Sequence, residues 1–309
     1  MRRILILLIL TLLPLPRAAC CGPEAAIRQT SARPDAGIVR QAVTYDPDRC
    51  GTAAPPGTPA PVPLPVIMYH SVLRHPNVPG SDYIVPPETV RDDAAWLRAH
   101  GYTPIRLSEL AAFADGDGTL PEKPMLLTFD DGYLNNAVYL PQIAQALDAP
   151  MLLCVVGRFA DDAETCFDRS PAYAMLRWGD LRRLRDTGLF EFACHTYDMH
   201  KLTPRRGIAP LPGEDPAAYR QALRADLSLM QTRLLDELGQ RSACFAYPFG
   251  AEADPAAEVL DDLGFRVRLT CRDMPNYVTP GHCLTLGRLN RPPGESTEAF
   301  MQRLLRHYA

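Results

Sequence analysis

The feature that most constrains the fold is an alternation of short apolar runs with helical patterns, which begins at Val66 and continues toward the C-terminus. Short runs rich in β-branched and aromatic residues predict buried strands. The segments between them carry apolar residues three and four positions apart, which predicts amphipathic helices. This alternation is typical of a parallel sheet covered by helices, so we expect a barrel or a doubly wound α/β fold.

Seven strands are predicted, with the sequences PVIMYH, PMLLTF, PMLLCVV, LFEFAC, ACFAY, FRVRLT and LTLGRL. Helices are predicted for residues 88–100, 108–114, 134–149, 178–188, 216–238, 254–264 and 296–307. A chain of 309 residues with an apolar fraction of 47% can form one α/β barrel with a substantial core.

The N-terminus has the pattern of an export signal, which we place at residues 1–19. Arg2 and Arg3 precede an apolar run over residues 4–15, and small residues follow at Ala18 and Ala19. That run is too short to span a bilayer comfortably. Lipid attachment at Cys20 is an alternative, although Arg17 stands where an apolar residue is usual. We therefore expect an exported protein, either secreted or associated with the cell surface.

Residues 20–65 are predicted to form a disordered, proline-rich spacer that ends in GTAAPPGTPAPVPLP. An N-terminal arm packed on the domain is the alternative interpretation. The spacer would separate a folded domain, residues 66–309, from a membrane or wall. A net charge of −4 with no basic block argues against a nucleic-acid partner, and we expect a monomer.

The nine cysteines are an odd number for an exported protein. Cys154, Cys194 and Cys244 lie in or at the end of apolar strand-like runs, which favours small buried side chains over disulfides. Cys271 and Cys283 flank a segment rich in Pro, Asn and Gly, and they are the more plausible disulfide pair.

Three polar or unusual clusters follow predicted strands directly. DDG follows MLLTF, His195 follows LFEFAC, and YPFG follows ACFA. The carboxyl ends of parallel strands meet at one edge of the sheet, where α/β barrels carry their chemistry. We therefore expect a functional site that combines these clusters.

Two histidines in the segment ACHTYDMH, His195 and His200, are five positions apart. Neither a helix nor a strand aligns side chains at that spacing, so a shared role requires a turn between them. With Asp131 they form a two-His, one-carboxylate set that suits Zn²⁺ or a similar divalent ion. Asp130 would then act as a general base on water. Asp-Asp-Gly alone is also ordinary turn chemistry.

The motifs TFDDG, HTYDMH and FAYPFG resemble, in this order, those of the polysaccharide deacetylases, the NodB-homology domains of carbohydrate esterase family 4. The resemblance covers residues 66–309. It implies a deformed (β/α) barrel that binds one divalent metal and hydrolyses acetamido groups on sugars. Asp131, His195 and His200 match the metal ligands of the family, and Asp130 matches its catalytic base.

The resemblance also implies further roles and shows two departures. The backbone N–H of Tyr247 matches a group that stabilises the oxyanion. Ala246 replaces the arginine that orients the catalytic aspartate in the family, and Arg288 in LGRLNRP could supply that charge instead. The five-residue histidine spacing resembles a poly-N-acetylglucosamine deacetylase subgroup with an N-terminal YH motif. His70 in IMYHSV matches that motif as the general acid, with His282 as the alternative.

The resemblance therefore implies an N-deacetylase acting on an N-acetylated polysaccharide. Tyr133 follows DDG directly and Tyr197 lies inside the histidine motif, so we expect both to line the sugar site. The metal is expected to be Zn²⁺, with Co²⁺, Ni²⁺ and Fe²⁺ as alternatives. An O-acetyl esterase on the same fold is one rival interpretation, and a non-catalytic glycan-binding protein is another.

Overall fold

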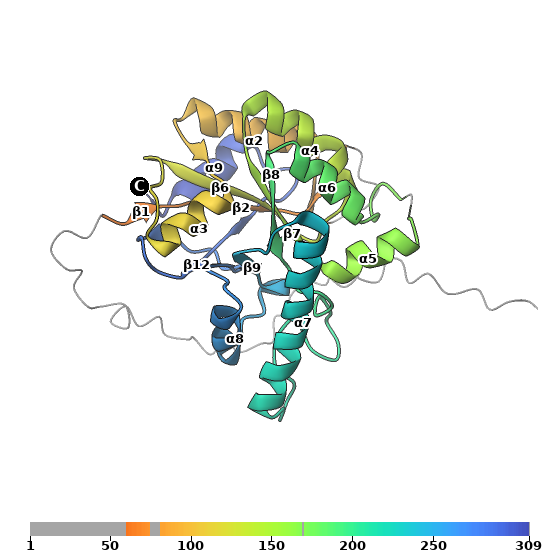
Figure 1. Ribbon diagram of the computed structural model, residues 1–309. Helices are drawn as coiled ribbons and strands as arrows, with labels where there is room; N and C mark the ends of the chain where they lie inside the picture. Colours follow the sequence, from red (N-terminus) through yellow and green to blue (C-terminus); the bar gives the residue numbers. More distant parts are fainter. Residues whose placement is uncertain (1–59, 75–80, 169, 309) are drawn as a thin grey trace, which may run out of the picture.

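The computed structural model describes residues 60–74, 81–168 and 170–308. Its core is a nine-stranded sheet in which eight strands follow the order β12, β10, β9, β8, β7, β6, β2, β13, while β5 pairs with β6 (Figure 1). All of these pairings are parallel. The strands are β2 (Val66–Tyr69), β5 (Thr103–Pro104), β6 (Pro124–Phe129), β7 (Met151–Val155), β8 (Phe190–Cys194), β9 (Cys244–Ala246), β10 (Val267–Leu269), β12 (Leu284–Leu286) and β13 (Leu289–Asn290).

The sheet curls into an incompletely closed barrel. Its two edge strands, β12 and β13, are consecutive in the chain and are separated only by Gly287 and Arg288. The side chain of Asn276 ties this corner to the start of β2, because its amide donates to the carbonyls of Leu64 (3.0 Å) and Gly287 (2.9 Å). The expected deformed (β/α) barrel is confirmed. The run LTLGRL, predicted as one strand, is instead the junction of two.

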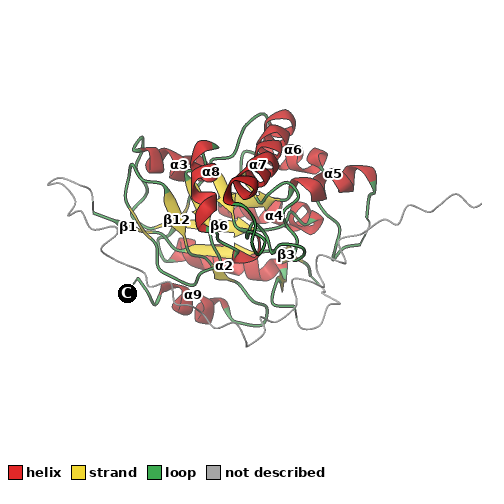
Figure 2. Cartoon of the chain, turned by 90° about the horizontal axis from the view of Figure 1, so that it is seen from below, coloured by secondary structure: helices red, strands yellow, loops and turns green. Residues whose placement is uncertain are grey.

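Helices connect most of the successive strands and cover the outside of the sheet (Figures 1 and 2). They are α2 (Pro87–Ala99), α3 (Leu107–Asp115), α4 (Leu134–Leu147), α5 (Gly157–Thr165), α6 (Trp178–Asp186), α7 (Pro216–Leu238), α8 (Ala257–Asp262) and α9 (Thr297–Leu305). The predicted helices are present, and α5 is an additional one. In the part of the chain that the structure describes, no helix has the length and apolarity needed to cross a membrane.

The two faces of the sheet belong to two hydrophobic clusters, because alternate residues of a strand point to opposite faces. The larger cluster joins residues such as Leu127 and Phe129 to the helices α2, α4, α6, α7 and α9. The smaller one joins Leu126 and Leu152 to α3 and to the β10–β12 end of the sheet. The strands are thus buried on both faces, as expected for a parallel sheet.

The folded domain begins earlier than predicted. The short strand β1 (Val62–Pro63) pairs with β11 (Tyr277–Val278), and Leu64 is fully buried. The last residues of the predicted spacer therefore belong to the domain, because Leu64 packs into the smaller core. The predicted signal peptide and the spacer up to residue 59 lie outside the described residues.

Candidate active site

The predicted site residues come together at the carboxyl edge of the sheet. His70 follows β2, Asp130 and Asp131 follow β6, and His195 follows β8. Arg288 follows β12 at the same edge. Because these strands are parallel and adjacent or nearly so, their ends bring together side chains that are far apart in the sequence.

Asp131, His195 and His200 form the candidate metal centre. One carboxylate oxygen of Asp131 lies 3.5 Å from Nε2 of His195 and 3.1 Å from Nε2 of His200. All three side chains are buried, and their ligand atoms lie within 4.8 Å of one another. Burial opposes ionisation of Asp131, yet the two histidines hold the pKa of its carboxyl well below the ordinary value.

The donor set fits a divalent ion of the zinc type. Ligand atoms at about 2.0–2.2 Å from a tetrahedral ion are about 3.3–3.6 Å from each other, which is close to the two distances from Asp131 to the histidines. The ring of His195 is also oriented as a metal ligand requires, because its Nδ1 lies 2.8 Å from the carbonyl oxygen of Ala246. Donation of the Nδ1 proton to that carbonyl leaves a lone pair on Nε2, which faces Asp131.

Backbone strain is concentrated around this centre. Among the described residues, the non-glycine residues with positive φ are Asp131, Asp148, Thr196 and Phe249. Asp131 is a candidate ligand and Thr196 follows another, while the ring of Phe249 lies 4.4 Å from that of His200. Left-handed backbone is unfavourable for β-branched and bulky residues, and such strain tends to gather at functional sites.

Asp130 forms a buried, bidentate pair with Arg288. The guanidinium donates to the two carboxylate oxygens at 2.7 and 2.8 Å, and its Nε donates to the carbonyl of Thr270 at 2.9 Å. Burial alone would raise the pKa of Asp130, but the positive charge of Arg288 outweighs it and lowers this pKa to about 2. Arg288 thus supplies a positive charge beside Asp130, as the sequence suggested it could. Its side chain is fully buried, so it contacts Asp130 rather than a substrate.

His70 lies beside the two aspartates, and its ring packs edge-on against Tyr83 with centroids 4.6 Å apart. Its Nδ1 is buried without a hydrogen-bond partner among the described residues. Burial lowers the pKa of His70, and the nearby carboxylates of Asp131 and Asp130 only partly oppose this effect. The alternative residue, His282, precedes β12 and so lies at the opposite, amino edge of the sheet.

The backbone N–H of Tyr247 is not free for an oxyanion. It donates to the carbonyl of Leu269 on β10 at 3.0 Å, because β9 and β10 continue their pairing to this point. The expectation for this group therefore conflicts with the structure, and we do not assign it that role.

Two tyrosines predicted to line the sugar site are placed differently. Tyr133 is buried beside Asp131, and burial together with that carboxylate raises the pKa of its phenol well above the ordinary value. The hydroxyl of Tyr197 donates to Asp161 on α5 at 2.9 Å. In the structure both side chains therefore contact carboxylates of the protein, Tyr133 at Asp131 and Tyr197 at Asp161.

The cysteine predictions are partly confirmed. Cys154, Cys194 and Cys244 are buried, as expected for small apolar side chains. Cys271 and Cys283 are not joined by a disulfide. The reason is topological: Cys271 follows the carboxyl end of β10, whereas Cys283 precedes the amino end of the parallel strand β12.

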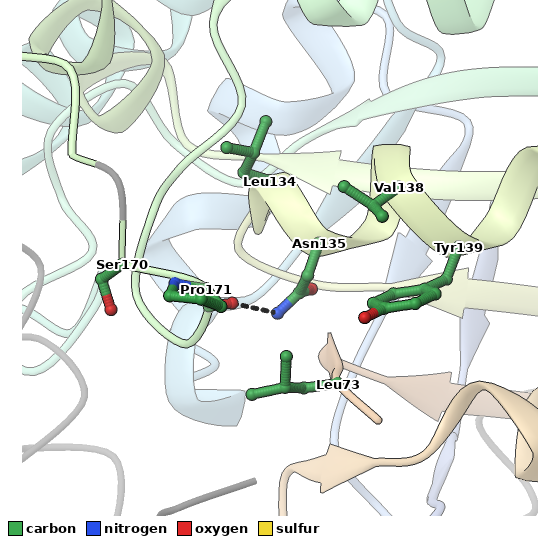
Figure 3. Close-up of a pocket in the computed structure, with 7 residues that line it drawn as sticks. All are labelled: Leu73, Leu134, Asn135, Val138, Tyr139, Ser170 and Pro171. Carbon is green, nitrogen blue, oxygen red and sulfur yellow. Dashed lines mark hydrogen bonds between the residues drawn. The ribbon is translucent and has the colours of Figure 1, made fainter. Parts of the chain in front are cut away.

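A cavity of about 140 Å³ lies between the start of α4, the segment after β3 (Ser71–Val72) and the loop near Pro171 (Figure 3). It is lined by Leu73, Leu134, Asn135, Val138, Tyr139, Ser170 and Pro171. Asn135 is fixed there, because its amide donates to Ser71 (2.8 Å) and to the carbonyl of Pro171 (3.2 Å). Two of the lining residues, Leu73 and Leu134, closely follow His70 and Tyr133 in the sequence, so the cavity lies on the α4 side of the site.

Sequence reasoning missed several residues that support the site, above all Asp226 on α7 and Asp161 on α5. Asp226 accepts hydrogen bonds from the backbone between His195 and His200. A signal for Asp226 existed: it is a carboxylate beside the apolar stripe Leu223, Leu227 and Met230 of its helix. Asp161 offered none, because α5 has too few apolar residues to be predicted.

The fold and the site together define a class of protein: parallel (β/α) barrels with an Asp-His-His ligand set beside a second carboxylate. Within that class, the chain carries a segment that matches the polysaccharide deacetylase family. The sequence model of this family matches residues 117–268, which include the two aspartates, both candidate histidine ligands and the FAYPFG segment.

Named relatives are similar over part or most of the chain. Poly-beta-1,6-N-acetyl-D-glucosamine N-deacetylase of Escherichia coli (strain K12) is 27% identical over 203 residues, which are 59% of this chain and 30% of that protein. The chain therefore spans less than a third of that relative's length. The protein named "Putative polysaccharide deacetylase YxkH" of Bacillus subtilis (strain 168) is 22% identical over 290 residues, which are 92% of this chain and 91% of that protein.

Solved structures show the same fold. IcaB from Ammonifex degensii matches with a TM-score of 0.64 and 24% identity, over 82% of this chain and 99% of that one. A de-N-acetylase from Aggregatibacter actinomycetemcomitans matches with a TM-score of 0.65 and 20% identity, over 78% of this chain and 99% of that one.

Proposed function

We propose that the chain is an exported, metal-dependent hydrolase that removes N-acetyl groups from a polysaccharide containing N-acetylglucosamine. The observation that carries the proposal is the convergence of Asp131, His195 and His200 beside the Asp130–Arg288 pair. The match to the polysaccharide deacetylase model and the named activity of the Escherichia coli relative support the same reaction. Export is supported by the signal-like N-terminus.

Asp131, His195 and His200 would hold the ion, and Zn²⁺ suits this donor set best. When bound, a divalent ion lowers the pKa of water and polarises a carbonyl group. The low pKa of Asp131 keeps its carboxylate ionised at neutral pH, and donation of the Nδ1 proton of His195 to Ala246 would leave its Nε2 for the ion. Although burial lowers the pKa of His195, its contact with Asp131 outweighs burial and raises it, so metal binding would displace a proton from this ring.

Asp130 is the general base in this proposal. With its pKa lowered to about 2, it is ionised at neutral pH and ready to accept a proton from water. Arg288 occupies one lone pair on each carboxylate oxygen, and a second lone pair on each remains for that proton. A low pKa makes Asp130 a weak base, so the contribution of Arg288 is to fix the direction in which the proton is accepted.

His70 is the proposed general acid. Water attacks the acetyl carbonyl carbon, and the amide C–N bond then breaks as the nitrogen receives a proton from His70, giving acetate and a free amine. Because burial lowers the pKa of His70, its protonated form is a stronger acid than ordinary imidazolium but a minor species at neutral pH.

That property of His70 favours one rival activity, O-deacetylation. An alkoxide leaves from an ester more readily than an amine anion leaves from an amide, so an ester substrate depends less on a proton donor. The two activities are separated by comparing amide and ester substrates in the variant His70→Ala.

The identity of the substrate is tested by measuring acetate release from poly-β-1,6-N-acetylglucosamine, peptidoglycan and chitin oligomers. We expect release from poly-β-1,6-N-acetylglucosamine, the polymer named for the Escherichia coli relative. If none of these glycans yields acetate while an O-acetylated glycan does, the N-deacetylase proposal is wrong.

A further inference from the structure

The backbone between the two candidate histidine ligands is held by a carboxylate on α7. Asp226 accepts hydrogen bonds from the N–H groups of Tyr197 at 2.8 Å and of Asp198 at 2.7 Å. The two bonds reach different oxygens of the same carboxylate, so the side chain grips two successive peptide units. Bonds from N–H groups to an ionised acceptor are stronger than those between neutral groups.

Two carbonyl groups of the same turn are held by the start of α5. The N–H groups of Gly157 and Arg158 donate to the carbonyls of Thr196 (3.1 Å) and Tyr197 (2.8 Å). The approach is close, because a Cβ on Gly157 would lie 2.7 Å from the ring of Tyr197. Two helices thus fix four backbone groups between His195 and His200.

This turn needs external support. Thr196 has φ of 70°, a left-handed conformation that is unfavourable for a β-branched residue, and its hydroxyl is buried without a partner among the described residues. Strained backbone persists only where the surrounding contacts over-determine it. Asp226 is also mostly buried, and among the described residues its side chain is the one that accepts from these two N–H groups.

We propose that Asp226 is a positioning residue of the metal centre, whose carboxylate sets the turn that carries His200 to its ligand position five residues after His195. The inference rests on the proposed function in one respect, namely that Asp131, His195 and His200 bind a divalent ion. Asp226 does not touch the ion or the substrate, and it acts through Tyr197 and Asp198.

The test is the affinity of the metal-free, full-length chain for Zn²⁺, measured by competition with a chromophoric chelator. Asp226→Ala should bind Zn²⁺ about 10- to 100-fold more weakly, the range found when groups that orient metal ligands are removed. Asp226→Asn keeps one acceptor oxygen but turns an amide NH₂ toward a backbone N–H, so it should fall between Asp226→Ala and the unaltered chain.

Asp236→Asn is the matched control, because it removes an exposed carboxylate from the same helix. It should bind Zn²⁺ like the unaltered chain. The melting temperature of each metal-free variant is measured in parallel, and the visible spectrum of the Co²⁺ form reports the ligand geometry. A purely structural role for Asp226 would lower the melting temperature without changing the affinity or the spectrum.

The outcomes separate the two proposals. If the unaltered chain fails to bind Zn²⁺, the metal centre itself is wrong and this inference falls with it. If the unaltered chain binds, His200→Ala does not, and Asp226→Ala binds with unaltered affinity, only the positioning role is overturned. Should Asp226→Ala fail to fold, Asp226→Asn decides: at least threefold weaker binding supports the role, and unaltered binding refutes it.

Discussion

Replacing Arg288 by methionine should expose how strongly the Asp130 carboxylate depends on it. In the structure, Arg288 holds the pKa of Asp130 at about 2, against an ordinary value of 3.8. Without Arg288, only burial and the more distant histidines act on the carboxyl, and burial raises its pKa. The pKa should therefore rise by at least about two units, which corresponds to at least about 2.7 kcal/mol.

At neutral pH, the loss in free energy of unfolding should exceed this energy, because Arg288→Met leaves a buried carboxylate without its partner. Breaking a buried pair in this way costs about 3–5 kcal/mol. In the unaltered chain the folded-state pKa of Asp130 is depressed, so its stabilising contribution is present above pH 4 and is lost as the pH falls toward 2. In Arg288→Met the folded-state pKa of Asp130 is raised instead, so the ionised carboxylate destabilises the folded protein at neutral pH. Lowering the pH protonates the carboxylate and removes this destabilisation.

The assay is urea unfolding of both chains at pH 7 and pH 4, together with acetate release at pH 7. The difference in free energy of unfolding between the two chains should be largest at pH 7 and smaller at pH 4. Arg291→Met is the matched control, because Arg291 forms an equally buried pair with Asp93 away from the ligand set. It should lose stability but keep acetate release at temperatures where it stays folded. Unaltered acetate release by Arg288→Met, or a loss below about 1 kcal/mol, would refute the reasoning.

Three further changes test other parts of the site and fold. Asp130→Asn should lower acetate release about 10²- to 10⁴-fold while Zn²⁺ binding is retained; loss of metal binding would show that Asp130 is a ligand instead. His70→Ala should impair amide hydrolysis by a similar factor and ester hydrolysis much less; equal losses would contradict its role as general acid. Gly287→Ala should destabilise the barrel corner by about 1–3 kcal/mol, because its Cβ would lie 2.4 Å from Met274; an unchanged urea midpoint would contradict that packing.

The sequence predicted the parts of this protein that depend on local pattern. Strands such as PMLLTF are continuous apolar runs because both faces of the sheet are buried, and the long helix over residues 216–238 has the predicted bounds. The clusters after β6 and β8 meet as expected, because parallel order alone brings their ends together. The choice of His70 over His282 follows from the same rule.

The parts that the sequence could not predict depend on contacts between distant segments. Arg288 reaches Asp130 across 158 positions, and the sequence could only suggest this pairing. The family resemblance implied an oxyanion role for the N–H of Tyr247, and no local pattern shows that Leu269 on β10 accepts its hydrogen bond. Helix α5 has no apolar stripe and was therefore not predicted. The contact between Asp161 on this helix and Tyr197 could not be predicted either.

The central claim is that Asp131, His195 and His200 hold a divalent ion that deacetylation requires. Its most direct test is acetate release from poly-β-1,6-N-acetylglucosamine by the full-length chain before chelation, after chelation, and after Zn²⁺ is restored. The account predicts that release is lost with the chelator, returns with Zn²⁺, and is absent from His200→Ala under all three conditions. Acetate release that survives complete removal of the metal would contradict it.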